Sequence, residues 1–212
     1  MPQKRIPLEP GQMYHIWTHA NGDENLFRED ENYRYFLEKY IYHLHPVVET
    51  FAYCLMPNHL HLMIRVKGKK DVLEFVRKKK EDYSTLQGFG TLGGFSNVIS
   101  HQFSNLFNAY TQAYNKKYDR KGSLFISNFR RKKITTAQYF ARLIVYIHNN
   151  PVHHGFVEHT NNWPHSSWHA YMLDRGTKIN REEGLKWFGG KKAFKQVHDN
   201  LNPPNLVSVF EG

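Results

Sequence analysis

The stretch from residue 51 to residue 66 most constrains the fold, because a mostly apolar run there contains two histidines one residue apart. Side chains alternate between the two faces of a β-strand, so residues i and i+2 point the same way. We therefore expect His59 and His61 to project from one face, roughly 6.6 Å apart at about 3.3 Å per residue. That spacing lets both imidazoles reach one metal ion. Leu60 and Leu62 should point to the opposite face, into a core.

The remaining pattern predicts an α+β fold. Short apolar and aromatic runs predict four strands, over residues 14–20, 47–56, 59–66 and about 130–134. Helical spacing predicts helices over 30–44, 97–118 and 136–150 and one that Asp71 caps, with Asp30 and Thr136 as further caps and Pro46 and Pro151 as stops. This order matches a ferredoxin-like split βαβ unit, with a central antiparallel sheet and helices packed on one face of it.

The predicted domain covers residues 1–172. Residues 173–212 are expected to form a C-terminal helical extension that packs on the domain or trails from it, with Gly189 and Gly190 separating two short helices. Residues 88–94 are rich in glycine but lack a phosphate-loop pattern, so we expect a flexible insertion there.

Composition narrows the class of protein. Lys and Arg number 29 against 19 Asp and Glu, a formal net charge of +10, which favours an anionic partner such as nucleic acid. Cys54 is the single cysteine, so the sequence offers no disulfide within the chain and no cysteine-based zinc site. No apolar run approaches the ~20 residues of a membrane helix. We expect a cytoplasmic protein with no membrane partner.

The segment from residue 146 to residue 152 adds chemistry to the histidine pair. On a helix, Tyr146 and Asn150 are four residues apart and share a face, from which a hydroxyl and an amide oxygen could address whatever the histidines hold. His148 lies off that face. Taken singly, a His-x-His pair, a helical tyrosine and an asparagine before a proline are each more often structural than catalytic. Their joint occurrence favours a site.

Four segments in this order, 56–62, 109–118, 122–125 and 146–152, resemble the single-tyrosine HUH transposases, where HUH denotes His-hydrophobe-His. Within that insertion-sequence-type family the chain is most similar to the REP-associated tyrosine transposases, over about residues 12–172, and residues 187–190 echo the longer members. The resemblance implies an HUH endonuclease domain that cleaves and rejoins hairpin-containing single-stranded DNA. Tyr146 would be the nucleophile and would form a covalent 5′-phosphotyrosine.

The resemblance also implies a cofactor, Mg²⁺ or Mn²⁺, held by His59, His61 and Asn150. An amide oxygen and phosphate oxygens suit these ions, whereas paired imidazoles alone favour Zn²⁺ or Ni²⁺. Basic clusters near the motifs, with Phe125, Phe129 and Tyr118 among them, predict DNA contacts. The predicted DNA-binding residues are Arg77, Lys78, Lys79, Lys116, Lys117, Arg120, Lys121, Phe125, Arg130, Arg131, Lys132 and Lys133.

Two other functions remain open from the sequence. One is a metal-dependent hydrolase, in which zinc on the two histidines activates water and Tyr146 has no role. The other is a catalytically inactive DNA-binding relative that retains only the basic surface. The partner in either DNA-binding case is single-stranded or hairpin DNA, and the protein is expected to be a monomer or a homodimer.

Overall fold

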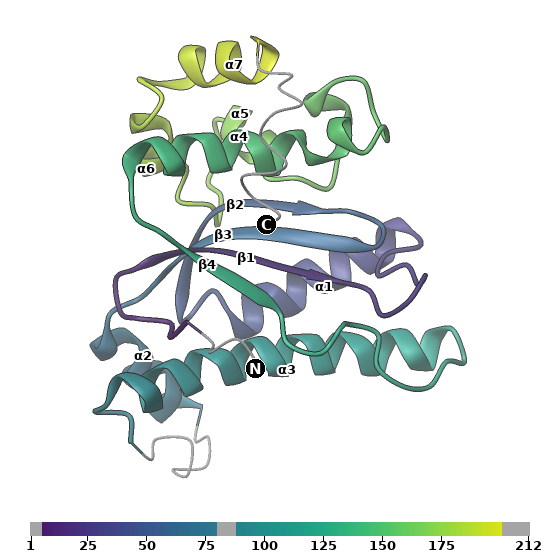
Figure 1. Ribbon diagram of the computed structural model, residues 1–212, viewed down its shortest axis with the longest axis vertical. Helices are drawn as coiled ribbons and strands as arrows, with labels where there is room; N and C mark the ends of the chain where they lie inside the picture. Colours follow the sequence, from purple (N-terminus) through teal and green to yellow (C-terminus); the bar gives the residue numbers. More distant parts are fainter. Residues whose placement is uncertain (1–5, 80–87, 201–212) are drawn as a thin grey trace.

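The computed structural model describes residues 6–79 and 88–200. Four strands, seven α-helices and one short 3-10 helix follow one another along this part of the chain (Figure 1). They are β1 (Met13–His19), α1 (Asp30–His43), β2 (Val48–Leu55), β3 (His59–Val66), α2 (Lys69–Lys78), α3 (Leu92–Lys117), β4 (Arg130–Ile134), α4 (Ala137–His153), the short 3-10 helix η2 (Thr160–Asn162), α5 (Trp168–Met172), α6 (Arg181–Lys186) and α7 (Lys191–Asn200).

The four strands form one sheet in the order β2-β3-β1-β4, and every neighbouring pair is antiparallel. This is the strand order of a split βαβ unit, so the predicted α+β fold is confirmed. Residues 56–58 form the tight turn between β2 and β3, closed by a 2.8 Å hydrogen bond from the backbone N–H of Met56 to the carbonyl of His59.

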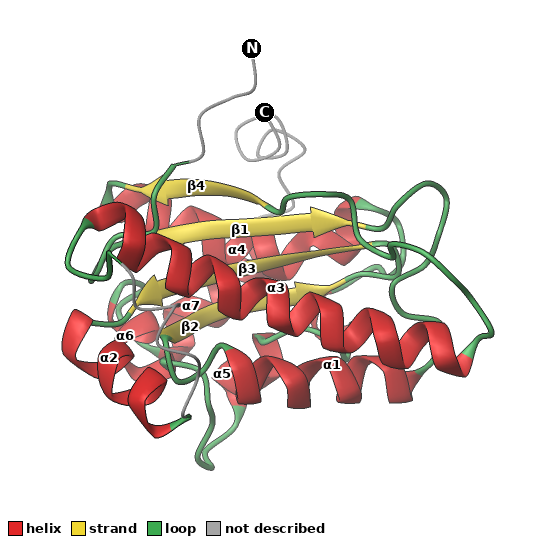
Figure 2. Cartoon of the chain, turned by 90° about the horizontal axis from the view of Figure 1, so that it is seen from below, coloured by secondary structure: helices red, strands yellow, loops and turns green. Residues whose placement is uncertain are grey.

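Helices cover both faces of the sheet, which corrects the expectation of helices on one face. Figures 1 and 2 show α1 and α3 on one side and α4 on the other, and Figure 1 shows α7 beyond α4. The reason is that the sheet buries residues on both faces, with a second core formed by Phe51, Ala52 and Cys54 of β2 and by residues of α4. Leu60 and Leu62 pack in the core beneath α1 and α3, as predicted, while Met63 packs in a second core with residues of α4.

Helix α3 begins at Leu92, five residues before the predicted start, so the end of the glycine-rich segment is helical. Thr91 caps it, because its hydroxyl accepts a 3.0 Å hydrogen bond from the backbone N–H of Gly94. A Cβ at Gly94 would collide with the carbonyl of Gly88, so glycine is needed there for close backbone approach. The predicted flexible insertion is therefore wrong for residues 92–94.

Two predicted helix caps are also displaced. Helix α1 begins at Asp30, but the residue in the capping position is Glu29. Helix α2 begins at Lys69 after Gly68, so Asp71 lies in the first turn, where a carboxylate favours the positive end of the helix dipole.

Thr136 caps α4 as predicted, and its hydroxyl accepts a 3.2 Å hydrogen bond from the backbone N–H of Tyr139. The predicted stop at Pro151 is wrong, because α4 continues to His153. Every residue from 143 to 151 is buried, so packing on both sides holds this helix past the proline. Beyond it, the backbone N–H of His154 still bonds to the carbonyl of Asn150 at 3.1 Å.

Helix α7 packs on the outer side of α4, where its His198 lies 3.0 Å from His148. The two short helices α6 and α7 lie on either side of Gly189 and Gly190, as predicted. Phe194 of α7 is fully buried, and its ring stacks on Tyr171 at 4.5 Å between centroids. The division of the chain at residue 172 stays a prediction, and residues 201–212 lie outside the described residues. Within the described residues, no helix is long and apolar enough to cross a membrane.

Candidate active site

The two histidines of β3 lie on the face of the sheet that α4 covers. In the antiparallel register, His59 stands opposite His19 of β1, and His61 stands opposite Trp17. Their imidazole rings are 5.2 Å apart between centroids and almost perpendicular, at 88°. The alternation of strand side chains thus places both rings on one side, as the spacing predicts.

Helix α4 brings the other two predicted residues to the same place. The side-chain oxygen of Asn150 lies 2.9 Å from His59 Nε2. The Tyr146 ring lies 5.5 Å from the His61 ring between centroids and meets it edge-on at 84°. All four side chains are buried, with exposed fractions of 0% for Tyr146, 1% for Asn150 and His61, and 3% for His59.

His15 of β1 is a third histidine in this site, and the sequence reasoning assigned it no chemistry. Its Nε2 lies 3.0 Å from His61 Nδ1. Its ring stacks on Trp17 at 4.6 Å and lies 6.1 Å from the Tyr146 ring. The sequence does indicate that His15 and His19 share one face of β1, because side chains alternate between the two faces of a strand. What the sequence could not supply was the pairing of that face with β3.

The hydrogen bond between these two histidines bears on which nitrogen of His61 can act as a ligand. A neutral imidazole has one N–H and one lone pair. If His61 Nδ1 donates to His15, the Nε2 atom of His61 keeps its lone pair, and that buried atom has no hydrogen-bond partner among the described residues. A buried lone pair without a partner is what a metal ligand needs.

Electrostatics keeps both rings neutral. Burial, with a smaller contribution from the neighbouring imidazoles, lowers the pKa of His61 well below its ordinary value. Burial also lowers the pKa of His15 to about 3, and the positive charge of Lys132 adds to this shift. Neutral imidazole is the form that binds metal ions.

His59 is oriented in a similar way by a neighbour. Its Nδ1 lies 2.8 Å from the side-chain oxygen of Asn58, which fits an N–H donor at Nδ1 and a lone pair at Nε2. In this assignment the Nε2 lone pair faces the Asn150 oxygen, while the Asn150 nitrogen has no partner among the described residues. Two acceptor atoms facing each other repel. The contact is favourable when a cation or a proton lies between them, or when the amide oxygen and nitrogen of Asn150 are exchanged.

The donor set fits a divalent cation. Two ligands adjacent on an octahedral ion, each at about 2.1 Å, are about 3.0 Å apart, close to the 2.9 Å between His59 Nε2 and the Asn150 oxygen. The described residues contain no group of three or more His, Cys, Asp or Glu side chains that could hold a metal ion. The set therefore depends on the amide oxygen of Asn150 as its third protein donor.

His148 turns away from this site. Its Nε2 lies 2.7 Å from the Ser167 hydroxyl, and its Nδ1 lies 3.0 Å from Nε2 of His198 on α7. His198 Nδ1 in turn donates to the carbonyl of Phe194 at 2.8 Å. This buried chain of hydrogen bonds ties α7 to the outer side of the helix that carries Tyr146.

The predicted DNA contacts on β4 divide between the two faces of the sheet. Arg130 and Lys132 stand opposite Trp17 and His15, so they lie on the face of the candidate site. Arg131 and Lys133 lie on the other face. Arg131 donates to the Ser100 hydroxyl at 3.1 Å, and Lys133 pairs with Glu9 at 2.9 Å.

The other predicted DNA contacts lie outside the four-residue site. Arg77, Lys78 and Lys79 end helix α2, whereas Lys116, Lys117, Arg120 and Lys121 lie at and beyond the end of α3. Three of these basic side chains form salt bridges with carboxylates, in the pairs Lys78–Glu74, Lys117–Glu29 and Arg120–Glu24. Phe125 is only 6% exposed, so little of its ring is available for stacking. Their roles in DNA binding stay predictions.

A split βαβ sheet that presents a His-hydrophobe-His pair to a tyrosine on a packed helix is the arrangement expected of the single-tyrosine HUH class. No family model matches the chain. A Haemophilus influenzae protein described as "Putative REP-associated tyrosine transposase" is 27% identical over 128 residues, which are 59% of this chain and 61% of the relative. The match thus spans about three-fifths of that relative's length.

A solved structure has a similar fold. It is the structure of a REP-associated tyrosine transposase bound to a REP hairpin, and it matches with a TM-score of 0.60 at 17% identity. The match covers 85% of this chain and 94% of that chain. Sequence and fold comparisons thus confirm the resemblance to the REP-associated tyrosine transposases.

Proposed function

We propose that this protein is a DNA strand-transferase that cleaves and rejoins hairpin-containing single-stranded DNA through a covalent 5′-phosphotyrosine at Tyr146. The proposal rests on one observation: four polar side chains, two from β3 and two from α4, lie together between the sheet and α4. Tyr146 contacts the His61 ring edge-on, and Asn150 lies 2.9 Å from His59. The similarity to a transposase and to a hairpin-bound structure supports the same reading.

In the proposed cleavage, the phenolic oxygen of Tyr146 forms a bond to a backbone phosphorus, and the bond from that phosphorus to the 3′-oxygen of the preceding nucleotide breaks. The phenol loses its proton, and the leaving oxygen gains one to become a 3′-hydroxyl. The phosphotyrosine ester conserves the energy of the broken bond, so a 3′-hydroxyl of another strand can reverse the step. A free phenol is only about 0.1% ionised at pH 7, so the site must assist its attack.

His59, His61 and Asn150 would hold the divalent cation, proposed to be Mg²⁺ or Mn²⁺. When bound, such an ion polarises the scissile phosphate and neutralises the charge that develops on it. In the tautomer described above, the His61 Nδ1–H donates to Nε2 of His15, which leaves the His61 Nε2 lone pair available. Asn58 does the same for His59 through Nδ1.

The test is covalent capture of DNA. The protein is incubated with Mg²⁺ or Mn²⁺ and a labelled single-stranded hairpin from the sequence flanking its own gene, then run on a denaturing gel. Wild type should give a shifted protein–DNA band, and Tyr146→Phe should abolish it while keeping hairpin binding. Tyr139→Phe is the matched control, two helical turns earlier on α4, and should still capture DNA.

Each other result favours a different function. Cleavage that persists in Tyr146→Phe would make water the nucleophile and support the metal-dependent hydrolase. Hairpin binding without any cleavage by wild type would support the inactive DNA-binding relative. Replacing both His59 and His61 by alanine should eliminate cleavage and weaken binding much less.

A further inference from the structure

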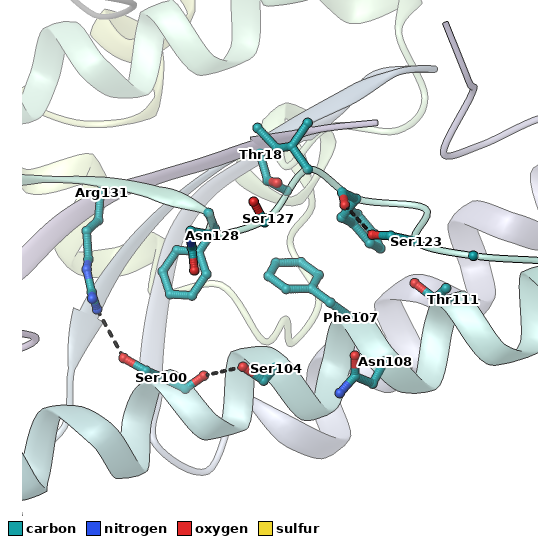
Figure 3. Close-up of a pocket in the computed structure, with 14 residues that line it drawn as sticks. Thr18, Ser100, Ser104, Phe107, Asn108, Thr111, Ser123, Ser127, Asn128 and Arg131 are labelled. Carbon is teal, nitrogen blue, oxygen red and sulfur yellow. Dashed lines mark hydrogen bonds between the residues drawn. The ribbon is translucent and has the colours of Figure 1, made fainter. Parts of the chain in front are cut away.

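A second hollow lies on the opposite face of the sheet from the candidate active site. It is a pocket of about 470 Å³ between α3 and the segment 122–131, which leads into β4. Figure 3 shows side chains from both elements around it, with the Phe107 ring lying across its middle. Its volume lies within the range of about 300–1,000 Å³ usual for small-ligand sites.

The wall of the pocket is aromatic on one side and neutral-polar on the other. The Phe107 ring packs against the Phe125 ring, with 4.7 Å between their centroids, and this contact holds the Phe107 ring in place. Asn108, Thr111 and Ser127 also line the pocket, and their side chains make no hydrogen bond with the residues that the structure describes. The pocket therefore offers a ring to stack on and amide and hydroxyl groups that are ready to bond.

Among the lining residues that the structure describes, Arg131 alone is charged, and it already donates to the Ser100 hydroxyl at 3.1 Å. A site for a free anion needs several cations, and a site for an apolar ligand would leave the amide and hydroxyls unsatisfied. A planar, neutral ligand with several donors and acceptors satisfies both surfaces. A nucleobase has that chemistry, because bases stack on aromatic rings and are read by hydrogen bonds along their edges.

The position of the pocket suggests how a base reaches it. Strand β4 is one of the two edge strands of the sheet, and it carries Arg130 and Lys132 on the face of the candidate active site and Arg131 on the pocket face. Lys121, next to Gly122 of the pocket lining, adds an exposed cation. A DNA backbone following these charges would pass around the edge strand from one face to the other.

We propose that this pocket receives one unpaired base of the same hairpin-containing DNA whose phosphate is cleaved beneath α4. The proposal rests on the proposed function for its DNA substrate. It adds a binding site that is separate from the cleavage site. Phe107 provides the stacking surface, and Asn108 provides hydrogen bonds to the base edge.

The experiment uses the full chain and the hairpin from its gene's flank, with 2-aminopurine replacing each unpaired base in turn. At one position, binding to wild type should quench the fluorescence by stacking, and Phe107→Leu should restore it. Asn108→Ala should weaken binding of the unmodified hairpin about tenfold, the loss expected for about 1.4 kcal/mol of hydrogen bonding. An abasic site at the quenched position should remove this difference between Asn108→Ala and wild type.

Asn105→Ala is the matched control, because Asn105 lies three residues earlier on α3 and does not line the pocket. It should bind like wild type. Unchanged quenching in Phe107→Leu and unchanged affinity in Asn108→Ala would overturn the pocket proposal while leaving covalent capture by Tyr146 intact. Release of the quenched base by millimolar free deoxynucleotide would assign the pocket to free nucleotides instead. Failure of wild type to bind the hairpin would overturn both proposals.

Discussion

Replacing His15 by phenylalanine should weaken metal binding without removing any proposed ligand. The substitution keeps an aromatic ring between Trp17 and His61, where the His15 ring stacks at 4.6 Å and 5.2 Å between centroids. It removes the nitrogen that lies 3.0 Å from His61 Nδ1. His61 is buried, so its Nδ1–H is left without a partner, and the alternative tautomer would place the proton on the proposed ligand atom.

The magnitude follows from the cost of that unpartnered group. Leaving a buried donor unsatisfied costs about 1–3 kcal/mol, which is about a 5- to 150-fold change in an equilibrium constant. Loss of a group that orients a metal-bound histidine typically costs 10- to 100-fold in affinity. We therefore expect His15→Phe to bind Mn²⁺ about 10- to 100-fold more weakly than wild type in isothermal titration calorimetry.

His15→Gln is the control for this prediction, because its side-chain oxygen can still accept a hydrogen bond from His61 Nδ1. It should recover part of the affinity. Circular dichroism would establish that both variants fold. If folded His15→Phe binds Mn²⁺ as tightly as wild type, His15 does not orient His61, and the assignment of the free lone pair to His61 Nε2 is wrong.

Three further predictions concern stability and DNA binding. Gly94→Ala should destabilise the protein by about 1–3 kcal/mol, because the new Cβ would collide with the backbone of Gly88. Gly176→Ala is the control, since a Cβ there has open space and should change the melting temperature little. Equal melting temperatures of the two variants would contradict the close approach. Hydrogen bonds from the Arg65 guanidinium on β3 hold the pKa of Glu183 below its usual range. The contribution of the ionised Glu183 to stability is therefore present above pH ~4.3, the pKa of an unfolded glutamate, and is lost as the pH falls through the lower pKa of the folded state. The urea midpoints of wild type and Glu183→Gln should therefore differ at pH 7 and converge in acid, and a constant difference would refute this. Lys121→Ala should reduce the slope of log binding constant against log salt concentration by about one unit. Lys117→Ala should reduce this slope less, because the Lys117 ammonium already pairs with carboxylates. Equal slopes for the two variants would show that the Lys117 ion pairs open on DNA binding.

The local patterns that predicted the placement of the four side chains correctly were short-range ones. Alternation within one strand placed His59 and His61 on one face, and helical spacing placed Tyr146 and Asn150 on another. The contact between these pairs came from the resemblance to a family, because residues that are 91 positions apart, such as His59 and Asn150, leave no local signal.

The elements that were missed all depend on tertiary packing. His15 acquires its partner from the register of β1 against β3, which local alternation does not determine. Helix α4 passes Pro151 because burial on both sides compensates for the lost backbone hydrogen bond. Residue 94 of helix α3 is a glycine because its close approach to Gly88 leaves no room for a Cβ. The helices on the second face follow from a second core, to which β2 and Met63 of β3 contribute apolar side chains.

The central claim is that one particular phenol becomes bonded to DNA, and peptide mass spectrometry tests it most directly. Wild type is incubated with metal and hairpin, the captured complex is digested with protease and nuclease, and the modified residue is located. We predict a nucleotide attached to the side-chain oxygen of Tyr146. A nucleotide on another tyrosine, or cleaved DNA with a free 5′-phosphate and no modified peptide, would contradict the account.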